Sequence, residues 1–412
     1  MNDREQRGLQ IAALCQIDRK GSVYLVPAQS GRGKYTVCPD HDNPHCSCPD
    51  HETRGVVCKH IFAVRCVQKR EQSMDGITTT LTQTVTITEE KRKTYAQNWP
   101  AYDRAQMHEK EKFRSLLHDL CEGIEEPSAG KGRPRISLAD AIFSAAYKVY
   151  STVSGRRFMT DLREAHAAGF IERMPCFSSL MGCLESEAVT PILTAMIVQS
   201  SLPLKSVEVD FAVDSSGFTT SRFIKWFDHK YGKPRQEHEW VKVHLMCGVK
   251  TNVVTAVEIR GKDAQDCPLL PDLVKTTAKN FSVQEVSGDK AYGSFKNYDA
   301  ISAVGATPFI PFKTHQGFSG KHKLWGQMFH YFMFRREEFC QHYHKRSNVE
   351  STFGMIKAKF RDHVRSKTDV AMRNEALCKI LCHNICCLIS AMYELGIEPE
   401  FWGEKGDAAK IG

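Results

Sequence analysis

Neither a signal peptide nor a long uninterrupted hydrophobic run is evident in the sequence. The first ten residues, MNDREQRGLQ, are polar and charged, so they lack the apolar core that a signal peptide needs. The longest apolar stretch, residues 376–392, is interrupted by Lys379, His383 and Asn384, and its apolar residues recur at helical spacing. This pattern predicts a core helix rather than a membrane span. We therefore expect a cytoplasmic protein with no membrane partner, whose cysteines are free thiols or metal ligands rather than disulfides.

Internal repeats are missing too, and low-complexity sequence is confined to short linkers. The composition, with 42% hydrophobic and 25% charged residues, is that of an ordinary globular protein and excludes wholesale disorder. A length of 412 residues allows two to four domains at roughly 100–200 residues per domain. The net charge of +8 is only mildly basic, so its distribution along the chain is more informative than its total.

Changes in composition divide the chain into five segments. Their predicted boundaries are 1–75 for a Cys/His-rich segment, 76–135 for a linker ending in a basic hinge, 136–205 for a helical region, 206–395 for an α/β region and 396–412 for a tail. In the helical region, Ser137 and Thr160 are the expected N-caps. The hinge, Gly130-Lys-Gly-Arg-Pro-Arg135, either tracks a DNA minor groove or serves only as a linker.

The α/β region is predicted from a change of hydrophobic periodicity near residue 207. Strand patterns cover residues 207–213, 241–249, 253–259, 283–286 and 307–312, and helical patterns cover 267–278, 295–304 and the chain from 346 onward. Strands followed by alternating helices and strands indicate one mixed α/β layer domain.

The Cys/His-rich segment contains Cys46-Ser-Cys48 and, nine residues later, Cys58-Lys-His60. Three thiolates and one imidazole suit a closed, tetrahedral structural Zn²⁺ site, although Cys38, His45 or His51 could replace one of the four. The order resembles the SWIM zinc finger, in which Cys-x-Cys and Cys-x-His follow a β-hairpin, and the resemblance covers about residues 20–70. It implies a recognition module for DNA or protein rather than a catalytic centre.

Three acidic residues of the α/β region are candidates for a second metal site. Asp214 and Asp289 are expected at the ends of two strands, and Glu350 lies in a helical segment. Carboxylate oxygens suit Mg²⁺ or Mn²⁺, and two such ions can activate a nucleophile and stabilise the leaving oxygen of a phosphodiester. Asp210 is the local rival of Asp214, because it lies four positions earlier on the same strand face. Taken singly, each acid is more simply a surface carboxylate or a cap.

The helix around Glu350 makes the site more specific. Tyr343, Arg346, Glu350 and Lys357 have spacings of three, four and seven, which predicts a common helical face. The surrounding residues 313–367 contain twelve Lys or Arg and four Asp or Glu, a local net charge of +8. Cations and a hydroxyl beside a metal-binding acid suit a DNA backbone, whose phosphates they would hold.

The pattern Tyr-x2-Arg-x3-Glu-x6-Lys resembles the signature of a large group of insertion-sequence DDE transposases. Val213-Asp-Ser-Ser-Gly-Phe218 and Gly288-Asp-Lys-Ala-Tyr292 are similar to the blocks that carry the family's two catalytic aspartates. Gly261-Lys-Asp-Ala-Gln-Asp266 is similar to the block between them, where Asp266 either caps a helix or contacts the site. The short segment between residue 312 and Glu350 lacks the large β insertion that some members carry, so the DNA-hairpin step of those members stays open.

The resemblance covers residues 205–395 and implies an RNase H-like catalytic core preceded by a helical DNA-binding region and a small N-terminal zinc module. It implies that Asp214, Asp289 and Glu350 bind two Mg²⁺ or Mn²⁺ ions, and that Tyr343, Arg346 and Lys357 hold DNA phosphates. The enzyme would be an endonuclease that cleaves transposon ends and joins the 3′-hydroxyl to target DNA, acting as at least a homodimer on DNA in a prokaryotic nucleoid. A metal-dependent nuclease without strand transfer, or an inactive domesticated DNA-binding protein, remains an alternative.

Overall fold

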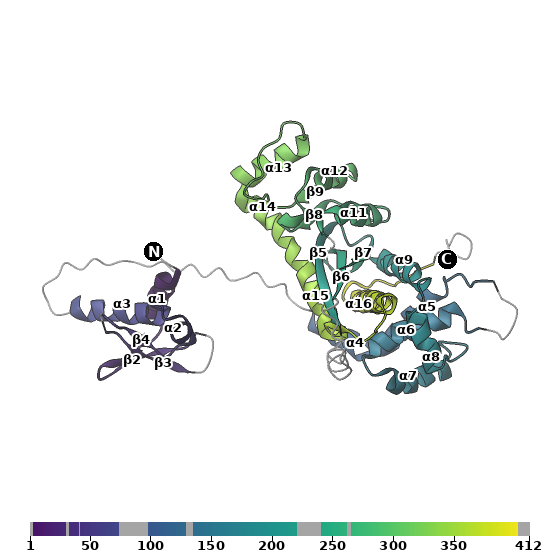
Figure 1. The fold of residues 1–412 in the computed structure, drawn as a ribbon, viewed down its shortest axis with the longest axis horizontal. Coiled ribbons are helices and arrows are strands. Elements are labelled where there is room, and N and C mark those ends of the chain that lie inside the picture. Colours follow the sequence, from purple (N-terminus) through teal and green to yellow (C-terminus); the bar gives the residue numbers. More distant parts are fainter. Residues whose placement is uncertain are drawn as a thin grey trace, which may run out of the picture. The chain divides into compact units, whose positions relative to one another are not determined.

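The computed structural model describes residues 3–29, 33–40, 42–73, 98–128, 135–220, 240–261 and 265–402. The Thr-rich part of the predicted linker, the hinge up to Pro134, most of the tail and residues 262–264 of the block before Asp266 lie outside the described residues. The chain forms two compact units, Met1–Tyr95 and Ala96–Gly412, and each is described by itself (Figure 1).

The first unit is a four-stranded antiparallel sheet with three helices, in the strand order β1-β2-β3-β4. Val26 and Val37 from the sheet and Ile61 and Val64 from α3 are fully buried together and form its core. Its elements are α1 (Asp3–Leu14), β1 (Asp18–Lys20), β2 (Val23–Pro27), β3 (Lys34–Cys38), β4 (His45–Cys46), α2 (Pro49–Arg54) and α3 (Lys59–Ser73). The β-hairpin followed by a helix that the sequence predicts is therefore present.

The second unit is built on a mixed sheet with the strand order β7-β6-β5-β8-β9. β5 pairs antiparallel with β6 but parallel with β8, and β8 pairs parallel with β9. A short sixth strand, β10, pairs with the end of β5. The strands are β5 (Asp210–Thr220), β6 (Trp240–Gly248), β7 (Val254–Arg260), β8 (Glu285–Gly288), β9 (Thr307–Phe309) and β10 (His363–Val364). The five strand predictions are confirmed, with shifted ends.

Both faces of this sheet are covered, as the alternation of residues along β5 requires. Phe211 and Val213 point into one apolar cluster, whereas Ala212 and Phe218 point into the other. The first face is covered by α11 (Leu270–Ala278), α12 (Phe295–Ala303) and α14 (Arg336–Tyr343), and η2 (Cys267–Leu269), η3 (Lys290–Tyr292) and α13 (Lys323–Phe334) pack around these helices. The second face is covered by α9 (Val189–Ser201), α15 (Ser347–Phe360) and α16 (Asp369–Leu395). Between α9 and β5 lies η1 (Leu202–Leu204), and between α14 and α15 lies η4 (His344–Arg346).

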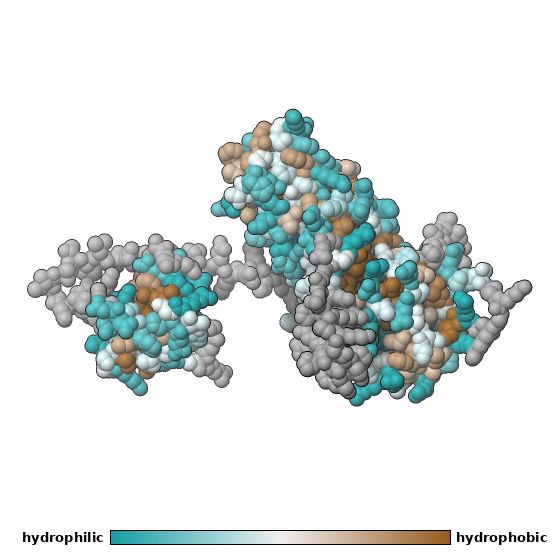
Figure 2. All heavy atoms as spheres, in the orientation of Figure 1, coloured by the Kyte–Doolittle hydropathy of each residue, from teal (hydrophilic) through white to brown (hydrophobic). Residues whose placement is uncertain are grey.

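The helix α16 is the centre of the helical layer (Figure 1). It packs against α4 (Trp99–Met107), α5 (Glu109–Cys121), α6 (Leu138–Ser151), α8 (Phe177–Leu184) and α9, and α7 (Gly155–Ala167) packs against α6. By length and composition alone α16 could cross a membrane, and the bent pair Phe177–Leu184 and Val189–Leu204 passes the same test, but 72% of the apolar window of α16 is buried inside the fold. The visible face of this unit is correspondingly mostly hydrophilic (Figure 2).

Two local predictions for the helical region meet different outcomes. Ser137 caps α6, since its hydroxyl accepts a hydrogen bond from the backbone N–H of Asp140 at 3.1 Å. The prediction for Thr160 is wrong, because Thr160 lies inside α7 and the N-cap position is Ser154. In addition, residues 101–120 of the segment 76–135 have a charged, helical pattern in the sequence, and the structure has α4 and α5 there, packed against α16.

A buried carboxylate, Glu375, ties the start of α16 to the segment after β10. It accepts hydrogen bonds from the backbone N–H groups of Arg365 and Ser366 and from the Ser366 hydroxyl, at 2.7–3.0 Å. Burial alone would raise the pKa of Glu375, but Lys148, Lys379 and these hydrogen bonds lower it overall. A carboxylate with a lowered pKa stabilises the fold above its unfolded-state pKa and loses that contribution as the pH falls.

We expect Glu375→Gln to lower the free energy of unfolding by roughly 1–3 kcal/mol at neutral pH, because the amide leaves a buried donor without an acceptor. Urea unfolding at pH 7 measures the loss, and the difference from wild type should shrink as the pH falls through the lowered pKa. The exposed Glu400→Gln is the control and should unfold like wild type. Equal stability of Glu375→Gln and wild type at pH 7 would contradict this role.

Candidate functional site

The first two acids of the predicted triad lie at adjacent positions, Asp214 within β5 and Asp289 directly after the parallel strand β8. β8 pairs with β5 up to the partners Val213 and Gly288. Asp214 and Asp289 are the residues that directly follow these two partners in the sequence. The prediction that Asp214 ends its strand is wrong, because it is the fifth of the eleven residues of β5. The neighbouring strand β8 does end there, so it gives β5 no backbone partner at Asp214, and we call this place the open edge. The Asp289 side chain accepts a hydrogen bond from Lys290 N at 2.6 Å.

Glu350 reaches this edge from α15, which packs on the sheet face that also carries Asp214. Val349, Phe353 and Ile356 bury the inner side of the helix against that face, and Glu350 stays exposed in its first turn. Arg346 connects the two acids: one guanidinium nitrogen donates to Asp214 Oδ2 at 2.9 Å, and the other donates to Glu350 Oε1. A strand acid and a helix acid, distant in sequence, thus share one arginine.

The charges in this group influence each other. Burial raises the pKa of Asp214, as do the negative charges of Asp289 and Glu350, against the opposing effects of the Ser215 N–H and Arg346. Although burial lowers the pKa of Arg346, the charges of Tyr343, Asp214 and Glu350 raise it overall. The acids therefore concentrate negative charge that one arginine does not fully offset, which is the electrostatic condition that favours a bound cation.

The four residues of the helical signature do not lie on a single α-helix, so the predicted common face is wrong in detail. Tyr343 ends α14, Arg346 ends the 3-10 turn η4, and only Glu350 and Lys357 belong to α15. Lys357 donates to Ser216 Oγ at 2.7 Å, and its ammonium lies 5.8 Å from the centre of the Phe218 ring. Arg346 and Lys357 still contact β5, Glu350 shares Arg346 with Asp214, and Tyr343 lies beside Arg346.

The rival acid Asp210 has a different environment. Its carboxylate accepts a hydrogen bond from Lys345 at 2.7 Å, and the same ammonium binds Glu285. Four residues along a strand correspond to about 13 Å, so Asp210 lies at the far end of β5 from the open edge. The interpretation of Asp214 as the site residue is the one that this arrangement favours.

On the opposite sheet face, behind Asp214, the predicted residue Asp266 lies in a polar cluster with Lys242 and His244, which the sequence pattern did not single out. Asp266 accepts hydrogen bonds from Ser215 Oγ at 3.1 Å and from Lys242 Nζ at 2.7 Å, and His244 Nδ1 is 3.3 Å away. It makes no side-chain cap of the following helix, so of its two predicted roles the contact beside the site is the one present. Polar residues at alternate positions of the otherwise apolar β6 were the available signal.

An uncharged residue at position 214 is expected to stabilise the metal-free protein. Since the folded-state pKa of Asp214 is raised, the charged carboxylate disfavours folding above that pKa, and the fold gains stability as the pH falls through it. Asp214→Asn should therefore raise Tm at pH 7 by a few degrees, about 2–4 °C per kcal/mol, and the gain should vanish in acid. Calorimetry without divalent metal measures this, and a lower Tm at pH 7 would contradict it.

In the first unit the four predicted zinc ligands come together. Cys46 lies in β4, Cys48 precedes α2, Cys58 precedes α3, and His60 is in the first turn of α3. Their ligand atoms all lie within 4.8 Å of one another, and all four residues are buried. His60 Nδ1 is 3.8 Å from Cys46 Sγ and from Cys58 Sγ, close to the ~3.8 Å edge of a tetrahedron with bonds of ~2.3 Å.

The chemistry of these thiols also fits a cation. The hydrogen bond between Cys46 and Cys58, together with burial, raises the pKa of Cys46, and the same bond lowers the pKa of Cys58 to about 3. Burial raises the pKa of Cys48. The three thiols therefore cannot all ionise together unless a positive ion joins them, which Zn²⁺ does when it binds thiolates.

No second group of three or more ligands as compact as this one occurs among the residues that the structure describes. Asp214, Asp289 and Glu350 do not form such a group, and Arg346 bridges two of them. Their hard oxygen donors and accumulated negative charge nevertheless fit Mg²⁺ or Mn²⁺, which take a few carboxylates and complete their shells with water and phosphate oxygens.

One comparison with known proteins finds a similarity in the region that carries the acids. Residues 205–385 match the family model described as Transposase DDE domain. The matched region begins just before β5 and ends within α16, so it includes Asp214, Asp289 and Glu350. No curated protein and no solved structure matches the chain. The match supports a DNA transposase, an enzyme that binds and cleaves nucleic acid with divalent metal.

Proposed function

From its transposase DDE domain, we propose that this protein is an insertion-sequence transposase that cleaves DNA at transposon ends and joins the freed 3′-hydroxyl to target DNA. One observation carries the proposal: Asp214 and Asp289 lie at one sheet edge, and Arg346 connects Asp214 to Glu350 on the packed helix. The mixed sheet, with an antiparallel β5–β6–β7 meander and parallel β8 and β9, supports an RNase H-like core.

The three acids would hold Mg²⁺ or Mn²⁺ and so place a scissile phosphate at the open edge. A divalent metal pair, when bound, supplies Lewis-acid stabilisation of the attacking and leaving oxygens. Arg346 keeps Asp214 and Glu350 near each other in the absence of metal. With these carboxylates engaged by metal, Arg346 would be free to hold a DNA phosphate, together with Tyr343 and Lys357 on the same segment.

The remaining segments would serve recognition. We assign residues 1–75 to a SWIM-type zinc module, 76–135 to a connecting segment that includes the packed helices α4 and α5 and the basic hinge, 136–205 to a helical DNA-binding region, 206–395 to the catalytic core and 396–412 to a tail. Two transposon ends must be held together for joining, so the working form would be a homodimer or larger assembly on DNA. Such an enzyme would act in the cytoplasm, associated with the nucleoid.

The test is cleavage and joining of a labelled DNA that carries the element's flanking ends, with Mg²⁺ or Mn²⁺ added. Metal-dependent joined products support the transposase. Cleaved but unjoined DNA would instead establish a nuclease without strand transfer. DNA binding without metal-dependent cutting would overturn the catalytic assignment and leave a domesticated zinc-containing DNA-binding protein.

A further inference from the structure

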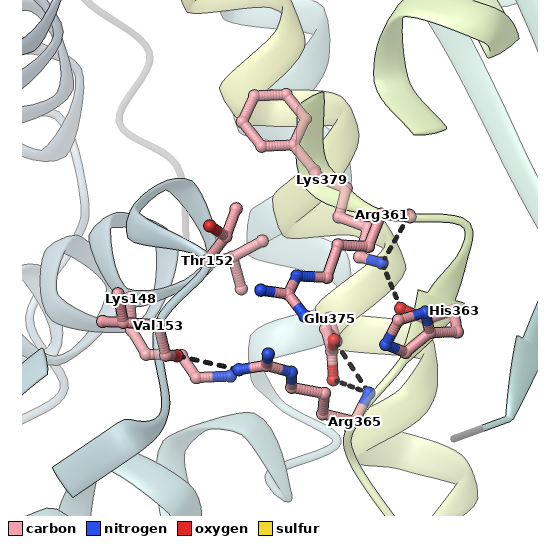
Figure 3. Close-up of a pocket in the computed structure, with 10 residues that line it drawn as sticks. Lys148, Thr152, Val153, Arg361, His363, Arg365, Glu375 and Lys379 are labelled. Carbon is pink, nitrogen blue, oxygen red and sulfur yellow. Dashed lines mark hydrogen bonds between the residues drawn. The ribbon is translucent and has the colours of Figure 1, made fainter. Parts of the chain in front are cut away.

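A strongly basic pocket lies away from the acidic edge, where α6 of the helical region meets the segment from the end of α15 to α16 (Figure 3). Its lining carries two lysines, two arginines and a histidine around a single carboxylate, Glu375. The residues that line it are Lys148, Val149, Thr152, Val153, Phe360, Arg361, His363, Arg365, Glu375 and Lys379.

The carboxylate in this pocket is already occupied by the protein's own groups. Glu375 accepts hydrogen bonds from Ser366 and the Arg365 backbone, Lys379 donates to the carbonyl oxygens of Arg361 and His363, and the Arg365 guanidinium donates to Val153 O at 3.0 Å. Four cationic side chains, two lysines and two arginines, thus face one carboxylate whose acceptor sites are used by neighbouring donors.

Two cations of the pocket keep free donors. Lys148 is 7% exposed, and within the described part of the chain its ammonium donates no hydrogen bond. Arg361 is exposed, lines the pocket, and has a guanidinium without a hydrogen-bond partner among those residues. A nearly buried ammonium normally has a partner. The positive charges also oppose each other: burial, Lys148 and Arg365 lower the pKa of Lys379 to about 8, although Glu375 raises it.

The backbone conformation of Arg361 also supports a role for its side chain in the pocket. Arg361 follows the last residue of α15 with φ 73° and ψ 150°, a left-handed conformation that glycine adopts easily and a long side chain does not. An arginine at a position that suits glycine is retained at a cost in conformational free energy. The side chain it directs into the pocket is a sufficient reason for that cost.

We infer that this pocket binds a backbone phosphate of DNA, with Lys148 and Arg361 as the donors. The assignment rests on the proposed function for its choice of DNA among phosphate-bearing ligands. Its position fits, because Glu350 and Arg361 lie eleven residues apart along α15, about 16 Å at 1.5 Å per residue. That is the axial length of about five base pairs. A duplex cut at the acidic edge can therefore reach the pocket with a phosphate a few nucleotides away.

Arg361→Gly is the decisive variant, because it removes the donor and relieves the backbone at once. The full-length chain is titrated onto a fluorescein-labelled 30-base-pair duplex by anisotropy, without Mg²⁺, Mn²⁺ or chelator, over a range of NaCl concentrations. We expect Tm to stay equal or rise while Kd weakens several-fold at 0.15 M salt. The slope of log K against log salt should fall by about one, the value of one lost phosphate contact.

Lys148→Met tests the second donor with a side chain of similar length, and Lys279→Gln is the matched control. Lys279 is exposed at the end of α11, on the other face of the sheet, and its loss should leave the slope unchanged. If Lys148→Met fails to fold, Arg361→Gly still decides the question. Wild-type affinity and slope in Arg361→Gly would overturn the proposal.

A final experiment distinguishes binding of a DNA phosphate from binding of free inorganic phosphate. If millimolar inorganic phosphate raises Tm of wild type but not of Arg361→Gly, and the DNA slope is the same in both, the pocket binds free phosphate and the DNA assignment is wrong. Because no catalytic metal is present, this test is independent of cutting. Loss of the slope difference contradicts the pocket alone, whereas absence of metal-dependent cleavage contradicts the proposed function alone.

Discussion

Neutral replacement of any acid of the triad is expected to reduce metal-dependent DNA cleavage by about a thousandfold or more. Asp214→Asn, Asp289→Asn and Glu350→Gln keep the side-chain shape but remove a charge that a divalent cation requires. A loss of several kcal/mol in transition-state stabilisation corresponds to about three orders of magnitude in rate. The measurement is single-turnover cleavage of a labelled transposon-end duplex at saturating Mn²⁺.

Asp210→Asn is the matched control, because Asp210 lies on the same strand and face but pairs with Lys345. It should stay within a few-fold of wild type at a temperature where the fold is intact. Expected stability effects sharpen the comparison: Asp214→Asn should be inactive yet no less stable than wild type. Full activity of Asp214→Asn, or inactivity of a folded Asp210→Asn, would refute the assignment of the site.

Loss of one zinc ligand is expected to unfold the first unit and leave the second intact. Cys58→Ser removes a thiolate from the buried four-ligand cluster, and structural zinc contributes apparent binding free energies of about 10–16 kcal/mol in small zinc modules. We expect wild type to bind one zinc ion per chain, and Cys58→Ser to bind none. Trypsin should then cut residues 3–73 rapidly, while the unfolding transition of the second unit stays unchanged.

Cys38→Ser is the control for this experiment. Cys38 is a half-buried free thiol of β3, and from the sequence alone it could replace one of the four ligands. In the structure it lies outside the compact cluster. It should retain zinc and resist trypsin like wild type. Zinc loss in Cys38→Ser with retention in Cys58→Ser would show that the ligand set is different from the one that the cluster indicates.

The strand predictions show that the sequence pattern locates a strand but does not determine where that strand ends. The period-two alternation of residues 207–213 predicts a strand, but Asp214, Ser215, Ser216 and Gly217 end the apolar signal. β5 nevertheless continues to Thr220, because β6 supplies backbone partners for all these positions. Pairing across the sheet overrides local composition, and that is why Asp214 lies within a strand rather than at its end.

For the helical signature, the sequence pattern predicts one continuous helix where the structure has α14, η4 and α15. Spacings of three and four residues are compatible with one α-helix, and nothing in the residues between Tyr343 and Ser347 marks the 3-10 turn that separates α14 from α15. The role of Arg346 as a link between Asp214 and Glu350 also depends on partners 132 and 4 residues away. Only the packing of α15 on β5 brings these groups together.

Residue types at short spacing were sufficient to predict that Cys46, Cys48, Cys58 and His60 come together, because they are close in sequence and their chemistry is restrictive. Periodicity likewise predicted the mixed α/β character, whereas the roles of the three acids stay predictions. Tertiary structure decided which acid faces the open edge, where Asp266 acts and which cations are left without partners in the basic pocket. Those outcomes depend on long-range pairing and burial. The sequence determines which side chains carry charge, but the burial and the neighbouring charges of each side chain depend on the whole fold.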